Sequence, residues 1–336
     1  MRRTGLAIAG AIALLAALVV GAFAVGRYPV SPAELVAVMQ SKLFGTAHAL
    51  PATVETVVFG IRGPRILAAL LVGAALAASG AAYQGLFRNP LVSPDILGVS
   101  AGAAFGAVLG IFLSLDVWAI QGLAFVFGLA AVGAAYAIAA SLRGHDPILV
   151  LVLAGVVLGA LLGACIALVK YLADPYNQLP AITYWLLGSL AATNPGDVRS
   201  TLVPVAVGLV VLWLLRWRIT VLSLGDEEAA SLGIRAGRIR AIVIAAATLV
   251  TAAVVSISGI IGWIGLIVPH VARLLVGPDF RRLLPVAVLL GAGFLLGVDT
   301  LARTAARIEI PLGVLTAFVG TPLFLWLLAT ARRSWQ

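Results

Sequence analysis

Apolar runs of about 20 residues recur through the whole chain, and they limit the fold more than any other feature of the sequence. A helix of that length crosses a hydrocarbon core of about 30 Å, so each run is long enough to span a membrane. Hydrophobic residues fill 62% of the 336 positions and charged residues only 10%, which excludes an ordinary soluble domain. The sequence therefore predicts an all-α polytopic membrane protein, folded as a single transmembrane domain over residues 1–336.

The runs divide into ten predicted membrane crossings and one segment too short to cross. The run 5–25 follows the basic start Met1–Arg3; we favour an uncleaved first helix over a signal peptide, because its apolar length exceeds that of a signal core. Residues 175–192 are broken by Pro180 and predict a re-entrant or surface helix. The predicted crossings are 5–25, 64–86, 96–114, 117–141, 147–170, 201–217, 239–256, 258–275, 283–299 and 311–330.

A polar segment, about 26–61, separates the first two crossings and contains one helix signal. In SPAELVAVMQSKLF, Ser31 is placed to cap a helix, Pro32 suits its first turn, and Glu34 completes a capping box. The apolar residues of this stretch fall on one face, which predicts a helix on the membrane surface. These residues are Leu35, Val38, Met39 and Leu43.

The basic residues predict the orientation of the chain. An even number of crossings puts both termini on one side, and basic residues are enriched in cytoplasmic segments. With both termini in the cytoplasm, most of the 22 Lys and Arg residues are on the inside and the longest inside loop is about 216–240. This explains the net charge of +9 without a nucleic-acid partner. The inside residues are Arg2, Arg3, Arg88, Arg143, Arg216, Arg218, Arg235, Arg238, Arg240, Arg273, Arg281, Arg282, Arg332 and Arg333.

The predicted crossings contain almost no chemistry of their own. No span has a central Asp, Glu or His of the kind found in proton relays, and the three histidines are scattered. We predict no catalytic residue, no metal site and no cofactor. The lysine of a Walker A loop is absent too, because Lys42 and Lys170 follow Ser and Val instead of Gly. If the protein pumps a substrate, another polypeptide must bind the ATP.

Two alternatives from other classes stay open on these grounds. An ion-coupled secondary transporter would work without any ATPase, and a sodium site made of carbonyl groups would escape a search for charged residues. An intramembrane enzyme would need a nucleophile or carboxylate at mid-depth, which the sequence does not supply.

Two stripes of glycine follow a four-residue step. Such stripes let helices approach closely, so packing is one interpretation. The other is a smooth lining for the path of a bulky substrate. The stripes are Gly102, Gly106 and Gly110, and Gly155, Gly159 and Gly163.

The stretch GDEEAASLGI, residues 225–234, concentrates three carboxylates in a chain with only 13. In the first turn of a short helix they would favour the positive end of its dipole, and Gly233 would end it. From the residues alone, a solvated capped turn and a docking surface for a partner are equally open.

Four tracts together resemble the FecCD family of permease subunits. They are GIRGPRILAALLVGAALAASGAAYQGLFRNPLVSPDILGVSAGAAFGA (60–107), GDEEAASLGI, SGIIGWIGLIVPHVARLLVGPDFRRLLP (258–285) and IEIPLGVLTAFVGTPLFLWLL (308–328). The resemblance implies ten transmembrane helices in the FecCD-type permease fold, in the cytoplasmic membrane. It implies a second, most simply identical, permease subunit, two cytoplasmic ATPase subunits and an external substrate-binding protein. It implies a metal-chelate substrate, for which iron–siderophore ranks before haem and cobalamin. Permeases for molybdate-type oxyanions share the same scaffold.

The resemblance also implies two docking sites. The loop that matches GDEEAASLGI would dock on the ATPase, and three arginines near outside helix ends would pair with acidic residues of the binding protein. The ATPase-docking residues are Gly225, Asp226, Glu227, Glu228, Ala229, Leu232, Gly233 and Arg235. The binding-protein residues are Arg62, Arg65 and Arg303, with Arg307 nearby.

Overall fold

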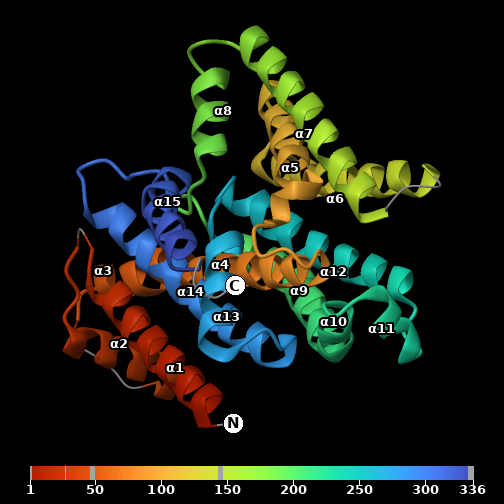
Figure 1. Cartoon of the computed structure of the whole chain (residues 1–336). Helices are drawn as coiled ribbons and strands as arrows, with labels where there is room; N and C mark the ends of the chain where they lie inside the picture. The colour runs from red at the N-terminus through yellow and green to blue at the C-terminus, as the bar shows by residue number, and fades with distance from the viewer. Residues whose placement is uncertain (1, 27, 46–49, 143–146, 332–336) are drawn as a thin grey trace.

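A computed structural model describes residues 2–26, 28–45, 50–142 and 147–331, and this part of the chain is helical without a strand (Figure 1). Seven helices are long and apolar enough to cross a membrane, and three shorter apolar helices, α5, α13 and α15, accompany them. The elements are α1 (Arg2–Ala24), α2 (Pro32–Phe44), α3 (Ala52–Glu55), the π-helix η1 (Thr56–Arg62), α4 (Gly63–Leu86), the 3₁₀-helix η2 (Pro94–Leu97), α5 (Val99–Phe112), α6 (Val117–Ser141), α7 (Pro147–Leu172), α8 (Gln178–Leu187), α9 (Pro195–Leu214), α10 (Arg216–Leu222), α11 (Asp226–Ser231), α12 (Ala236–Ser258), α13 (Ile264–Val276), α14 (Phe280–Thr304) and α15 (Leu312–Ala331).

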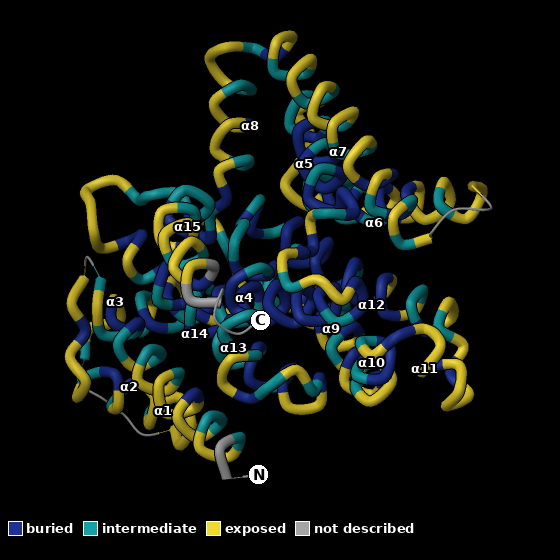
Figure 2. The backbone as a smooth tube through the Cα atoms, in the orientation of Figure 1, coloured by how far each residue is buried: buried dark blue, intermediate teal, exposed yellow. Residues whose placement is uncertain are grey.

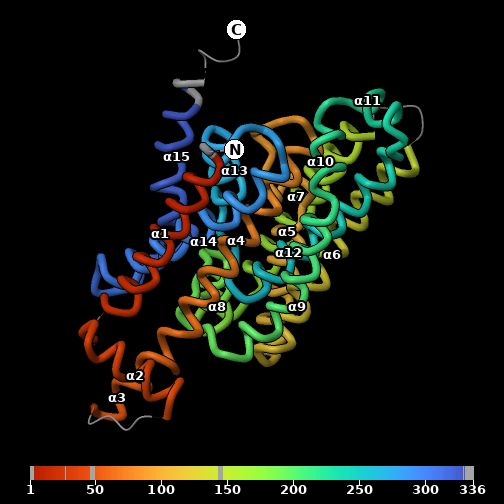
Figure 3. Tube along the Cα trace, turned by 90° about the horizontal axis from the view of Figure 1, so that it is seen from below, coloured from red at the N-terminus to blue at the C-terminus, as the bar shows by residue number. Residues whose placement is uncertain are grey.

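The helices form a bundle with two distinct ends. Figure 3 shows the start of α1, the end of α15 and the short helices α10 and α11 at one end, and α2 and α3 at the opposite end. We call the first the α11 end and the second the α2 end. Because the start of α1 and the end of α15 both lie at the α11 end, the described helices agree with an even number of crossings.

Helix α4 forms the centre of the bundle. Its most apolar window is 83% buried, whereas that of α7 is only 22% buried (Figure 2). Glycines allow its neighbours to approach: a Cβ on Gly73 would lie 2.2 Å from the carbonyl oxygen of Gly291 on α14. A Cβ on Gly80 would lie 1.9 Å from the carbonyl oxygen of Gly265 on α13. The backbones of α13 and α14 therefore touch that of α4 directly.

Buried hydroxyl groups join α4 to α12. The Ser79 hydroxyl lies 2.7 Å from that of Thr251, and the Tyr83 hydroxyl lies 2.9 Å from that of Thr248. In a hydrocarbon environment each of these groups must find its partner inside the protein. The pairs therefore fix how α4 and α12 face each other.

The segment between α1 and α4 confirms one predicted helix and adds another. Ser31 and Glu34 form the predicted capping box at the start of α2. Helix α2 buries Leu35 and Val38 against Val54 and Val58, so it packs on its own chain and only part of the predicted apolar face is left outward. Helix continues without a break from Ala52 into α4.

Several helix boundaries differ from the predicted spans. Helix α13 begins at Ile264 rather than near residue 258, because the preceding Gly259 adopts φ 67° and ends α12. Helix α8 has 10 residues, too few to cross a membrane, and so agrees with the short segment predicted there. Helix α14 extends at both ends of its predicted span, 283–299.

We expect Gly291→Ala to destabilise the protein, because the new methyl group would collide with the backbone of Gly73. Overpacking of this kind costs about 1–3 kcal/mol, more than alanine gains over glycine in a helix. Thermal unfolding of the purified chain measures the effect. The matched control is Gly133→Ala on α6, where a Cβ meets nothing within 4 Å. Equal melting temperatures for the two variants would contradict the packing described for α4.

Candidate functional site

The α11 end carries a short helix held on two buried residues. Ala229 is fully buried, and Ile234, which follows α11, packs in the same apolar cluster as residues of α10 and α12. Gly233 adopts φ 73°, and the N–H groups of Gly233 and Ile234 donate to the carbonyls of Ala230 and Ala229. Gly225, at φ 153°, starts the helix in a conformation that favours glycine. The two glycines therefore set the direction of α11.

The outward surface of α11 combines charge with apolar side chains. Glu227 and Glu228 are exposed and form no ion pair within the part of the chain that the structure describes. Leu232 and Leu224, 56% and 64% exposed, lie at the two ends of the same helix. Sequence analysis missed Leu224, because a leucine in so apolar a chain carries no signal of its own. We call Leu224, Glu227, Glu228 and Leu232 the α11 surface.

Other predicted docking residues have different surroundings. Asp226 is bound by Arg240, whose guanidinium nitrogen lies 2.9 Å from the carboxylate. Arg235 is exposed just after α11. The ion pair between Asp226 and Arg240 ties the start of α11 to α12.

A hydrogen-bonded latch joins this end of the bundle to α14. The Thr220 hydroxyl on α10 donates to Asp279 at 3.1 Å and accepts the N–H of Phe280 at 3.0 Å. Asp279 also accepts from the backbone and side chain of Arg281. Burial raises the pKa of Asp279, but the hydrogen bonds from Arg281 and Thr220 outweigh it and hold that pKa below its usual range. The carboxylate therefore stays charged and keeps α10 fixed to α14.

The α2 end gathers the three predicted arginines into one cluster. Arg65 lies between two carboxylates: its guanidinium is 2.9 Å from Asp299 on α14 and 2.9 Å from Glu309 in the loop before α15. Asp299 is fully buried, whereas Glu309 is partly exposed. The contact to Glu309 is two-pronged, with one nitrogen on each carboxylate oxygen.

The other two arginines hold the end of α1. Arg62 donates to the carbonyls of Phe23 and Tyr28, and Arg303 donates to that of Ala22. Cations that bind the last carbonyls of a helix satisfy groups that the helix leaves open and favour its dipole. Arg62 and Arg303 are only 5% and 9% exposed. In this conformation all three guanidinium groups are engaged within the chain.

The glycine stripes serve mainly as close contacts. A Cβ on Gly102 or Gly106 would lie 2.4 Å from a carbonyl oxygen of α6, and one on Gly110 would be 3.0 Å from Ile120. Gly155 is packed in the same way on Ile96. Gly159 and Gly163 instead face open space on α7, and Gly163 lines a cavity of about 480 Å³ between α7 and α8.

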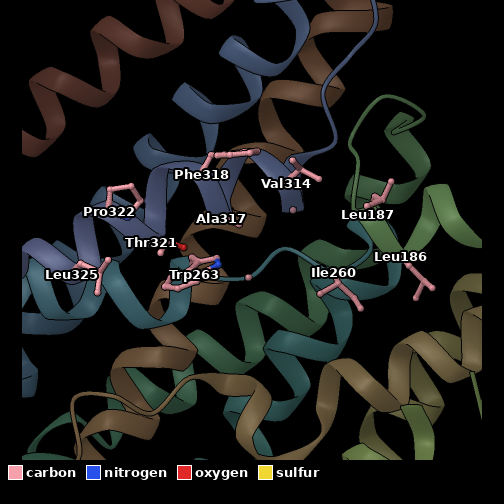
Figure 4. A pocket seen from close by; sticks show the side chains of 12 residues that line it. Leu186, Leu187, Ile260, Trp263, Val314, Ala317, Phe318, Thr321, Pro322 and Leu325 are labelled. Carbon is pink, nitrogen blue, oxygen red and sulfur yellow. The ribbon is translucent and has the colours of Figure 1, made fainter. Parts of the chain in front are cut away.

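A large apolar cavity lies between α8, the segment 260–263 that leads into α13, and α15 (Figure 4). Its volume is about 780 Å³, and Thr321 supplies the single side-chain hydroxyl among its lining residues. Sequence analysis placed these residues in separate stretches, 175–192, 258–285 and 308–328, but did not predict that they line one cavity, because the three segments are far apart in the chain. They are Leu186, Leu187, Ile260, Gly262, Trp263, Gly313, Val314, Ala317, Phe318, Thr321, Pro322 and Leu325.

Three backbones cross beside this cavity. A Cβ on Gly259 would lie 2.3 Å from the carbonyl of Trp185, and one on Gly313 would lie 2.7 Å from that of Leu187. The N–H of Leu312 donates to Gly188 at 2.9 Å. The end of α8 is therefore tied to the end of α12 and to the start of α15, beside the segment 260–263 and the helix that line the cavity.

The described residues thus form a helical bundle with seven helices long and apolar enough to cross a membrane and an apolar cavity between its helices. The family model of the FecCD transport family matches residues 14–330. The chain belongs to this family, as the four sequence tracts predicted, and is a multi-pass protein of the inner membrane.

Relatives of the chain act on different substrates. It is 45% identical over 83% of its length to the cobalamin import system permease protein BtuC of Halobacterium salinarum, covering 75% of that protein. It is 38% identical over 94% of its length to the molybdate import system permease protein MolB of Haemophilus influenzae, covering 93%. A solved structure described as an inward-facing metal-chelate type ABC transporter superposes with a TM-score of 0.87 at 37% identity, covering 96% of this chain and 98% of that one.

We expect Arg65→Gln to lower the free energy of unfolding by about 3–5 kcal/mol, because the buried Asp299 loses its hydrogen-bonded cation and keeps only Arg303, whose Nε lies 3.9 Å away. Adding Asp299→Asn should recover part of this loss. Chemical unfolding of the purified variants measures both.

The matched control is Lys42→Gln, which removes an exposed ion pair to Glu55 at 3.8 Å. Exposed pairs contribute about 0–1 kcal/mol. A loss for Arg65→Gln no larger than that of Lys42→Gln would show that the cluster does not hold the α2 end together.

Proposed function

We propose that this protein is the permease subunit of an ATP-driven importer that moves a metal chelate, an iron–siderophore complex first of all, into the cytoplasm. The observation that carries the substrate class is the apolar cavity of about 780 Å³ between α8, the segment 260–263 and α15. A cavity of this size and character suits a bulky ligand whose surface is largely organic. The chelator would surround the metal, so the permease would not need to coordinate it.

The lining of the cavity distinguishes between the substrates of the relatives. An oxyanion such as molybdate needs several N–H or O–H donors, or an arginine, to replace its water. The lining side chains offer the Thr321 hydroxyl and the indole N–H of Trp263. This favours a chelate over an oxyanion, and cobalamin and haem are the next candidates.

The α11 surface is the proposed docking site of the ATPase. Exposed leucines flanking two unpaired carboxylates form an apolar patch with charge to select its partner. Docking there places the α11 end in the cytoplasm, with both termini. Two ATPase subunits would then serve two copies of this chain, and the latch at Asp279 would pass their movement to α14.

The α2 end is the proposed docking site of a substrate-binding protein. Arg65 itself is mostly buried, but it is the member of the arginine cluster whose partner, Glu309, is partly exposed. A carboxylate from the binding protein would bind at Arg65, while Arg62 and Arg303 keep the end of α1 in place. Arg307, exposed in the same loop, would share this surface.

Uptake into proteoliposomes tests the proposal. The full chain, reconstituted with the ATPase and binding protein encoded beside it, should accumulate an iron–siderophore complex only with ATP and the binding protein present. Haem, cobalamin and molybdate are assayed in parallel. Uptake without ATP that follows an ion gradient would replace the importer with a secondary transporter, and uptake of molybdate alone would overturn the substrate class.

A variant of the cavity tests whether the substrate passes there. Thr321→Asp puts a charge on the apolar lining and should reduce chelate uptake at least about tenfold, since an unpaired carboxylate is costly in such a site. Thr321→Val is the matched control, because it keeps the size of the side chain and the apolar character, and it should transport normally.

Reversing both free carboxylates of the α11 surface should separate the permease from its ATPase. We expect Glu227→Lys with Glu228→Lys to abolish co-purification of the ATPase and ATP-driven uptake, while the protein stays folded, because neither residue is paired and the lost interaction with the dipole of α11 costs only about 0.3–1 kcal/mol for each. Glu55→Lys, an exposed carboxylate near the α2 end, is the charge-reversal control. Normal assembly of the double variant would remove the α11 surface from the mechanism.

A further inference from the structure

Another cavity, with polar side chains in its lining, lies at the α11 end. It is bounded by the end of α4, by α10, and by the turn from α13 to α14. Its volume is about 210 Å³. Its polar lining includes Arg88, Arg273, Gln84, Thr220 and Ser223, and no carboxylate is among the lining residues. Neither the apolar cavity nor the α11 surface includes any of these residues.

Arg88 lies at the end of α4, and no contact of its side chain within the described chain explains an arginine there. It follows the end of α4 with φ 51°, and the next N–H, that of Asn89, donates back to the carbonyl of Gln84. Glycine is the usual residue at this point of a helix end, since other residues are strained there. The Arg88 side chain is exposed, and no hydrogen bond or ion pair of it is found within the described chain. An arginine at this strained position points to a ligand outside the chain.

Arg273 adds a second cation with unused donors. One of its terminal nitrogens donates to Gln84 at 3.1 Å, while its buried Nε has no partner. Gln84 is a neutral partner, so the charge of Arg273 is not balanced by it. The carboxylate nearest along the chain, Asp279, already accepts from Arg281 and Thr220. The cavity therefore presents two uncompensated arginines, whereas the hydroxyls of Thr220 and Ser223 beside them already donate within the chain.

Exposed apolar side chains stand on the same elements that form the cavity. Leu274 and Leu275, which follow Arg273 on α13, are 64% and 50% exposed. Trp217 on α10 is also exposed, as aromatic residues are at the boundary between membrane and water. The helices α10 and α13, which carry lining residues of the cavity, thus also present apolar side chains outward.

We propose that this cavity binds the phosphate of an anionic phospholipid from the leaflet at the α11 end, with its acyl chains along Leu274 and Leu275. Arg88 and Arg273 would hold the phosphate oxygens, as basic pockets between transmembrane helices do. The bound lipid would then join α4, α10 and α13, next to the latch that links α10 to α14.

Native mass spectrometry of the full chain tests the site. The protein is equilibrated with equal amounts of phosphatidylglycerol and phosphatidylcholine, and the lipids retained are counted. We expect preferential retention of phosphatidylglycerol, and Arg88→Gln should weaken that preference about fivefold, the contribution of one arginine near anionic lipid. Arg88→Gln should fold normally, because the wild-type side chain makes no described bond.

The matched control is Arg218→Gln, an exposed arginine of α10 that does not line the cavity. It should leave the preference unchanged. Equal retention of the two lipids, or an equal effect of Arg218→Gln and Arg88→Gln, would overturn the proposal, the latter by showing only general attraction to a basic surface. Inorganic phosphate is added as a competitor: displacement of phosphatidylglycerol by free phosphate at the same concentration would assign the cavity to a soluble phosphate instead.

Discussion

Direct backbone contact around α4 is the constraint on which the other features of this bundle depend. In a membrane the hydrophobic effect gives helices no reason to associate, so close packing and internal hydrogen bonds must hold them together. Gly73 and Gly80 let α14 and α13 approach α4 until their backbones touch, and hydroxyl pairs fix α12 on another side. The outer helices, such as α7, are then free to present apolar side chains outward.

The same central helix connects the two candidate docking ends. Arg65 near the start of α4 binds Asp299 near the end of α14, at the α2 end. At the α11 end, α14 begins beside the latch of Thr220 and Asp279. Since α4 and α14 are packed together between these points, a displacement of α10 that moved α14 would act on the arginine cluster through the same contacts.

Sequence reasoning succeeded where the determining interactions are local. The capping box of Ser31 and Glu34 and the end of α11 at Gly233 depend on residues only a few positions apart, and the length of each apolar run is itself a local property. The predicted fold class and family were therefore confirmed. The start of α13 was misplaced because Gly259 and its neighbours are apolar, and hydropathy alone does not separate an apolar helix from an apolar break.

The candidate sites were less accessible because their partners are distant in the chain. Arg65 meets Asp299 and Glu309 more than 230 positions later, so sequence could place these groups near one end of the bundle without showing that they bind each other. The glycine stripes left two interpretations open for the same reason: Gly106 packs on α6, whereas Gly163, with identical spacing, borders a cavity. Small residues make either arrangement possible, and the choice depends on which helix lies opposite.

The arginine cluster at the α2 end shows that the role of a charged residue in such a protein depends on its partners rather than on its position. Three arginines near helix ends at one face are expected to receive carboxylates from outside, yet two of them satisfy the last carbonyls of α1 and the third is held by the chain's own acids. Any external carboxylate must therefore compete with Glu309, which is partly exposed and lies in a loop, and not with Asp299, which is fully buried. Exchange at Glu309 leaves the buried pair intact, so an incoming partner would change the α14–α15 loop without taking the core of the cluster apart. That loop leads directly into α15, which lines the apolar cavity. The proposed docking of a partner would therefore act on the helix that borders the proposed path of the substrate.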